Sequence, residues 1–289
     1  MKTIQTPTLE VAYEESGAAR GRPVILLHGF PDDVHAYDGV APVLAAGGWR
    51  VLVPYLRGYG PTRFRSTETP RSGQQAALGR DLADFMDALD LPRAVVAGYD
   101  WGGRAACIVA ALWPERVTGL VTMGGYNIQN IAVSRRPDLP ATEYRRWYQW
   151  YFHTERGRAG LTANRAALCR LLWELLSPNY CFDDATYEQS APSFENHAWA
   201  GPLIVNKYSR TAATRSPELA RRASSTSIIA IRSSPRTVTH NSLPFRLKVG
   251  SCGSRPTMMP LVSLSGLVVG PACGLGVLPI TRSVVVSTR

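Results

Sequence analysis

Acidic side chains are almost absent from the last third of this 289-residue chain. Residues 201–289 hold 12 Lys or Arg but a single acid, Glu218, and no aspartate follows Asp184. Residues 1–200 are balanced, with 20 Lys or Arg and 21 Asp or Glu. The formal net charge of +10 therefore belongs to one end of the chain. Those charges are neither clustered nor interleaved with aromatic residues, so we predict no nucleic-acid partner.

Cysteine is also scarce, and its positions lack the spacing of a metal site or of a disulfide framework. The five cysteines are Cys107, Cys169, Cys181, Cys252 and Cys273. We therefore predict no metal, and free thiols in a reducing, cytoplasmic setting. The N-terminus lacks the apolar segment of an export signal. The run at 261–280 is long enough for a membrane span, but its four glycines and two prolines argue against a membrane partner.

Residues 94–106, AVVAGYDWGGRAA, join a short apolar run to an alanine-rich helical pattern. The glycines Gly98, Gly102 and Gly103 around Asp100 would let a strand bend sharply into a helix and leave the aspartate exposed at the end of a sheet. A carboxylate in that position can attack an electrophilic carbon directly and form an ester. The alternative is an ordinary turn in which the aspartate caps the helix.

The flanking segments predict an alternation of strands and helices. Residues 2–14 suit an opening strand pair, and 23–29 and 49–62 contain apolar runs that end in glycine-containing turns. Residues 72–89 have apolar side chains at helical spacing, and 117–126 suit the strand after the Asp100 helix. This alternation predicts an α/β fold with a doubly wound, mostly parallel sheet.

The HGFPDD turn follows the first of these apolar strands, at the sheet edge where α/β proteins bind ligands. The backbone N–H groups of Phe30 and Trp101 are candidates for an oxyanion hole that receives negative charge. We expect His28 to be structural, because its side chain can serve the turn. Asp32 and Asp33 are expected to start the next helix.

Four motifs, LLHGFPDD, PYLRGYGPT, GYDWGG and ALWPERV, resemble in order and spacing the α/β-hydrolase superfamily, and specifically its epoxide hydrolase branch. The resemblance covers about residues 10–231. It implies the α/β-hydrolase fold with an inserted helical cap. The implied divisions are a core at 1–126, a helical cap at 127–210, a return to the core at 211–231 with a strand at 226–231, and an aberrant tail at 232–289.

The resemblance also implies a mechanism. Asp100 would attack an epoxide carbon, while two cap tyrosines hold and protonate the epoxide oxygen. The first tyrosine of the family lies in a YQxYF-like stretch, which matches Tyr148, and the second in an N-x-Y-x-R-like stretch, which matches Tyr208. A phenol suits this role because it donates a hydrogen bond while neutral at pH 7. Tyr151 and Tyr144 are the other candidates. No cofactor is implied, and the reactants are water and a small, mostly apolar epoxide.

Two other interpretations stay open. In haloalkane dehalogenases a tryptophan after the nucleophilic aspartate donates to the departing halide, and Trp101 fits that role as well. A non-catalytic protein that keeps only the scaffold is the other alternative. The paired tyrosines favour epoxides.

The second half of the mechanism needs a histidine that activates water and an acid that orients it. After the strand at 226–231 no aspartate occurs, and His240 follows too soon, so we interpret its local resemblance to the family's histidine loop as chance. From Arg232 onward the chain is rich in Ser, Arg, Pro and Gly without periodicity. We hypothesise that this tail is translated out of frame, the alternative being a genuine, divergent, disordered tail. The last strand and helix of the fold are thus predicted to be missing or disordered, and the ester on Asp100 to persist.

Overall fold

The computed structural model of the chain describes residues 1–123, 128 and 136–196, and beyond them the backbone of short strands. The strands are β1 (Lys2–Gln5), β2 (Leu9–Gly17), β3 (Pro23–Leu27), β4 (Arg50–Pro54), β5 (Arg63–Phe64), β6 (Ala94–Tyr99), β7 (Val117–Met123), β8 (Ala230–Ile231), β9 (Val262–Ser263), β10 (Gly266–Leu267) and β11 (Val284–Thr288). The α-helices are α1 (Ala41–Ala46), α2 (Gln75–Ala88), α3 (Asp100–Leu112), α4 (Pro140–Arg145), α5 (Trp147–Tyr151), α6 (Glu155–Ala163), α7 (Arg165–Leu176) and α8 (Asp184–Ser190). Short 3-10 helices are η1 (Val34–Tyr37), η2 (Pro114–Arg116) and η3 (Ala191–Glu195).

The main sheet has the order β1-β2-β4-β3-β6-β7-β11-β8. Strands β4, β3, β6 and β7 run parallel, whereas β1 and β2 form the antiparallel opening pair. The parallel strands are nearly continuous apolar runs, as expected where helices cover both faces of a sheet. The predicted mostly parallel sheet is therefore confirmed.

The end of the sheet beyond β7 is built from the C-terminal part of the chain. Strand β11 pairs antiparallel with β7, and β8 pairs antiparallel with β11. Of the range 226–231, in which a strand is predicted, the structure describes Ala230–Ile231 as β8, which joins the sheet through β11; residues 226–229 lie outside the described residues. Among the residues described after Asn196, all lie in such short strands.

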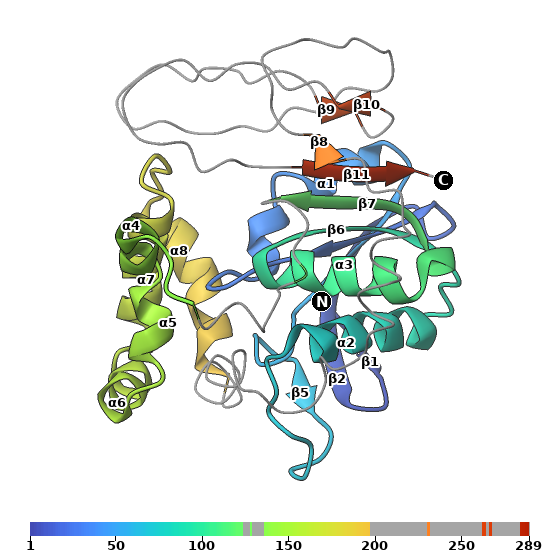
Figure 1. Cartoon of the computed structure of the whole chain (residues 1–289). Coiled ribbons are helices and arrows are strands. Elements are labelled where there is room, and N and C mark those ends of the chain that lie inside the picture. The colour runs from blue at the N-terminus through green and yellow to red at the C-terminus, as the bar shows by residue number, and fades with distance from the viewer. Residues whose placement is uncertain are drawn as a thin grey trace.

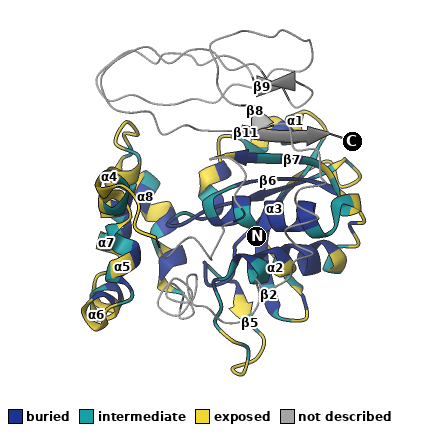
Figure 2. Cartoon of the chain, viewed as in Figure 1, coloured by how far each residue is buried: buried dark blue, intermediate teal, exposed yellow. Residues whose placement is uncertain are grey.

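Helices cover the sheet and give it its core. Figure 1 shows α2 and α3 side by side on one face of the sheet, with α1 behind it. Helix α3 is almost entirely buried, and Figure 2 shows this burial continuing into the central strands. Its alanine-rich sequence explains how it packs so closely, because small side chains let a helix approach the sheet.

Residues 136–196 form a helical segment, α4 to η3, beside the end of the molecule at which β7 terminates (Figure 1). The segment is anchored to loops of the core: Trp173 Nε1 donates to the carbonyl of Pro31 at 2.7 Å, and Asn196 Nδ2 donates to the carbonyl of Gly60 at 2.7 Å. This segment is the described part of the range 127–210, in which the cap is predicted. None of the described helices is both long and apolar enough to cross a bilayer.

Candidate active site

The site is organised by a sharp turn between β6 and α3. Asp100 has a φ of 43°, a left-handed conformation that few residues other than glycine adopt. A Cβ at Gly98 would lie 2.6 Å from the carbonyl carbon of Gly102, so the turn needs glycine there. The Asp100 side chain is 34% exposed. The chain therefore presents a carboxylate at the strand end, as the sequence predicts.

The HGFPDD turn supplies a donor to that carboxylate. The backbone N–H of Phe30 donates to Oδ2 of Asp100 at 3.1 Å, and Arg104 Nη2 lies 3.9 Å from Oδ1. Trp101 follows Asp100 on α3, and its buried ring stacks on Phe30 with centroids 6.1 Å apart. The structure thus brings both predicted oxyanion-hole residues, Phe30 and Trp101, next to Asp100. In the described ranges no group of three or more His, Cys, Asp or Glu is arranged to hold a metal ion.

Both ring nitrogens of His28 form hydrogen bonds with the backbone. The N–H of Leu56 donates to its Nε2 at 3.1 Å, which leaves the proton on Nδ1, and this nitrogen bonds the carbonyl of Gly29 at 3.0 Å. Burial lowers the pKa of the ring. His28 is therefore a neutral, structural residue as expected, and it has no nitrogen left to act as a base.

Asp33 starts η1, as expected, and also binds the helical segment. Its carboxylate accepts from the N–H of His35 at 3.0 Å. It also accepts from the hydroxyl of Ser190 at 2.7 Å and from that of Ser193. Asp33 is fully buried, so these donors compensate for the lost hydration of a charge. Sequence reasoning found the cap but missed the two serines, which lie about 160 residues further along the chain.

Asp32 does not cap the helix, so that expectation is wrong for this residue. Its Oδ2 instead accepts from the hydroxyl of Tyr99 at 2.8 Å. Burial, with the nearby charges of Asp100 and Asp33, raises the pKa of Asp32 to about 7. The tyrosine hydroxyl opposes this shift without cancelling it.

We expect Asp32→Asn to stabilise the fold at alkaline pH. The folded state keeps its proton on Asp32 between about pH 4 and pH 7 while the unfolded chain loses it, so wild-type stability falls over that range. The amide cannot ionise, and its oxygen can still accept from Tyr99. The free energy of unfolding should therefore exceed that of the wild type by about 1 to 2 kcal/mol at pH 8 and by little at pH 4. Urea titrations at the two pH values measure this, and an equal difference at both would contradict it.

Tyr148, on α5, reaches the HGFPDD turn from the helical segment. Its ring stacks on Phe30 with centroids 5.7 Å apart and an interplanar angle of 22°. Burial, followed by the negative charge of Asp100, raises the pKa of Tyr148. Gln149 Nε2 lies 3.3 Å from the Tyr148 hydroxyl. The structure therefore places Tyr148 close enough to Asp100 for the carboxylate charge to act on its hydroxyl.

The other predicted tyrosines do not share this placement. Tyr144 is 76% exposed. Tyr151 packs against α6, since a Cβ at Gly160 would lie 2.3 Å from its hydroxyl. Tyr208 and His240 lie outside the described residues.

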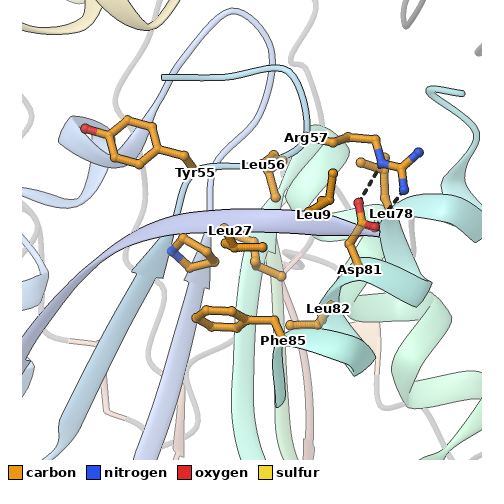
Figure 3. Close-up of a pocket in the computed structure, with 11 residues that line it drawn as sticks. Leu9, Leu27, Tyr55, Leu56, Arg57, Leu78, Asp81, Leu82 and Phe85 are labelled. Atoms are coloured by element: carbon orange, nitrogen blue, oxygen red, sulfur yellow. Dashed lines mark hydrogen bonds and ion pairs between the residues drawn. The ribbon is translucent and has the colours of Figure 1, made fainter. Parts of the chain in front are cut away.

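A cavity lies between the sheet and α2 (Figure 3). The residues that line it are Leu9, Val11, Leu27, Pro54, Tyr55, Leu56, Arg57, Leu78, Asp81, Leu82 and Phe85. Arg57, from the PYLRGYGPT motif, donates to Asp81 at 2.5 Å through Nε and at 2.6 Å through Nη2. This bidentate, nearly buried ion pair connects the loop after β4 to α2. Arg57 is thus structural, and the lining contains none of the predicted catalytic residues.

Known proteins resemble this chain in sequence and fold. A crystal structure from Klebsiella pneumoniae, of a protein provisionally named an epoxide hydrolase, is 42% identical and superposes with a TM-score of 0.73 over 77% of this chain and 76% of that one. Epoxide hydrolase B of Mycobacterium tuberculosis is 32% identical over 151 residues, which are 48% of this chain and 42% of the relative. A haloalkane dehalogenase of Mycobacterium marinum is 35% identical over 123 residues, 42% of this chain and 40% of the relative.

The chain thus spans less than half the length of these curated relatives. A family model described as the alpha/beta hydrolase fold matches residues 22–235, which is more than half of the chain. That match ends close to Arg232, where the composition of the sequence changes. The family match and the turn at Asp100 agree on the fold: the chain belongs to the alpha/beta hydrolase fold family, and it is similar to proteins named epoxide hydrolases and haloalkane dehalogenases.

Proposed function

We propose that this hydrolase opens epoxides through a covalent ester on Asp100. The observation that carries the proposal is the convergence of three groups: the Asp100 carboxylate, the Phe30 N–H that holds its Oδ2, and the Tyr148 ring stacked on Phe30. A carboxylate attacks a strained epoxide carbon without a base, and the opening ring needs a proton donor for its oxygen. This mechanism requires no cofactor.

The hydrogen bond at Oδ2 distinguishes the two oxygens of the nucleophile. Oδ1 is the attacking atom, and its bond to the epoxide carbon forms as the carbon–oxygen bond of the ring breaks. Oδ2 then becomes the ester carbonyl oxygen, next to the Phe30 N–H. That donor, together with the N–H of Trp101, would stabilise the negative charge on this oxygen when water attacks the ester.

Tyr148 is suited to protonate the departing oxygen. Its raised pKa keeps the phenol protonated at neutral pH. Attack converts the Asp100 carboxylate into a neutral ester, which removes one cause of the raised pKa at the moment when the alkoxide needs a proton. Tyr208 is proposed as the second donor. Aromatic neighbours, including Phe30, Trp101 and Phe152, favour an epoxide with an apolar substituent.

We expect Tyr148→Phe to slow ester formation by about 100-fold, because the alkoxide loses its acid. The measurement is the rate of mass gain of the intact protein during incubation with styrene oxide. Tyr144→Phe is the matched control, since Tyr144 is an exposed tyrosine on the neighbouring helix α4, and it should react at the wild-type rate. Equal rates for both variants would remove Tyr148 from the mechanism.

The same incubation tests the proposed function against its alternatives. We expect a stable adduct, little diol, and no halide release from 1-bromobutane. Halide release without reaction with the epoxide would identify a haloalkane dehalogenase, which the Mycobacterium marinum relative and Trp101 would then explain. Neither adduct nor halide would indicate a non-catalytic scaffold. Sustained diol formation would contradict the proposed loss of the hydrolytic step.

A further inference from the structure

Asp32 is fixed next to the turn that carries the nucleophile. Its backbone N–H donates to the carbonyl of Gly29 at 3.1 Å, which closes the turn that contains Phe30. Its Oδ2 accepts from Tyr99, the residue immediately before Asp100. The HGFPDD turn is therefore held to the nucleophile turn at two points, one through the Phe30 N–H and one through the Asp32 carboxyl.

Gly29 shows how closely these groups converge. A Cβ added there would lie 2.8 Å from the Cβ of Asp100 and 2.8 Å from Cε2 of Tyr99. Tyr99 Cε2 is one bond from the carbon that bears the hydroxyl, and this hydroxyl donates to Asp32 at 2.8 Å. Asp100 and the ring of Tyr99 thus both lie against Gly29, and Asp32 is bonded to the hydroxyl of that same ring. The charges of Asp32 and Asp100 are close enough to interact.

The surroundings of Asp32 make it a group that exchanges a proton near neutral pH. Tyr99 and Asp100 face it from the end of β6 and the start of α3, and Asp33 follows it in the chain. The charge of Asp32 also acts on Tyr37 and on Cys169 of α7, and its backbone interacts with His28. His28 is neutral and fully used by the backbone, so it does not compete as a base.

We propose that Asp32, held by Tyr99, accepts the proton of the water that hydrolyses the ester on Asp100. This inference rests on the proposed function. The water oxygen bonds to Cγ of the ester as its proton passes to Asp32, directly or through one further water. The bond between Cγ and Oδ1, the oxygen now attached to the substrate carbon, then breaks, and this departing alkoxide takes the proton from Asp32. Asp100 loses its own carboxyl proton, which balances the proton that Tyr148 gave.

This role gives the ester a slow route of decay without the histidine and acid of the family mechanism. Decay should require the ionised form of Asp32, so its rate should rise with pH and level off. The ester carries no charge at Asp100, which removes one cause of the raised pKa of Asp32, so the inflection is expected at or slightly below pH 7.

Asp32→Asn separates this role from a structural one. The amide keeps an oxygen for the Tyr99 hydroxyl and carries no charge, so adduct formation should stay within about threefold of the wild type. Adduct decay at pH 8 should slow at least tenfold, and its pH dependence near 7 should vanish. The measurement is intact mass after excess styrene oxide has been removed. Asp38→Asn, an exposed acid in the same region, is the control and should match the wild type.

Tyr99→Phe supplies an independent test. The Tyr99 hydroxyl lowers the pKa of Asp32, so its removal should shift the inflection of the decay rate to higher pH. Decay that is identical in Asp32→Asn and wild type, or an inflection that Tyr99→Phe leaves in place, would overturn the inference while the proposed function survives. A wild-type chain that forms no adduct would overturn both.

Discussion

Replacing Asp100 with asparagine should abolish the covalent adduct with styrene oxide, lowering its rate of formation at least 10³-fold. The amide has nearly the shape of the carboxylate, but it lacks the anionic oxygen that attacks the epoxide carbon. Asparagine also tolerates the φ of 43° and can accept from the Phe30 N–H, so the fold should be retained. Unfolding curves that match the wild type would show that the loss is chemical.

The position of the adduct decides the result, because epoxides also alkylate thiols. Cys181 is exposed, whereas Cys107 and Cys169 are buried. Cys252 and Cys273 lie outside the described residues, so the comparison is made in a Cys181→Ser, Cys252→Ser, Cys273→Ser background, with the adduct mapped to a peptide. A peptide containing Asp100 that is modified in the parent and unmodified in Asp100→Asn supports the proposal. An adduct elsewhere at an unchanged rate would show that Asp100 is not the nucleophile.

Local sequence patterns were sufficient for the core of the fold. The apolar runs before Gly29 and Gly98 predict β3 and β6, and the glycines around Asp100 predict the turn between β6 and α3. These features depend on neighbouring residues and on the few ways in which a strand can enter a helix. The structural role of His28 could likewise be predicted, since its partners lie in or beside the turn that it supports.

Contacts between segments that lie far apart in the chain could not be predicted from the sequence. Asp33 meets two serines about 160 residues away, and Asp32 meets Tyr99, 67 residues away. Two adjacent aspartates before an apolar segment indicate a helix start, and nothing in that pattern distinguishes the one that caps the helix from the one that accepts a hydrogen bond from Tyr99. The role of Tyr148 is predicted only through the family resemblance, because a lone tyrosine on an amphipathic helix is otherwise a packing residue.

Gly102→Ala should destabilise the protein by about 3 kcal/mol or more. A Cβ at this position would lie 2.1 Å from the carbonyl oxygen of Leu27 and 2.5 Å from that of His28, both backbone atoms at the end of β3. The Gly102 N–H also donates to the His28 carbonyl at 2.9 Å, so the contact is part of a hydrogen-bonded junction. Helix α3 would have to move away from the sheet, carrying Asp100 away from the Phe30 N–H.

The sign of this effect makes the test specific. In an exposed helix, glycine to alanine stabilises by about 1 kcal/mol, so helix propensity alone predicts the opposite result. Gly39→Ala is the matched control, because no heavy atom lies within 4 Å of a Cβ at that position and its stability should change by less than about 0.5 kcal/mol. Urea unfolding of the two variants measures both changes. A Gly102→Ala protein as stable as Gly39→Ala would mean that α3 does not approach β3 this closely, and the position of Asp100 over the Phe30 N–H would lose its support.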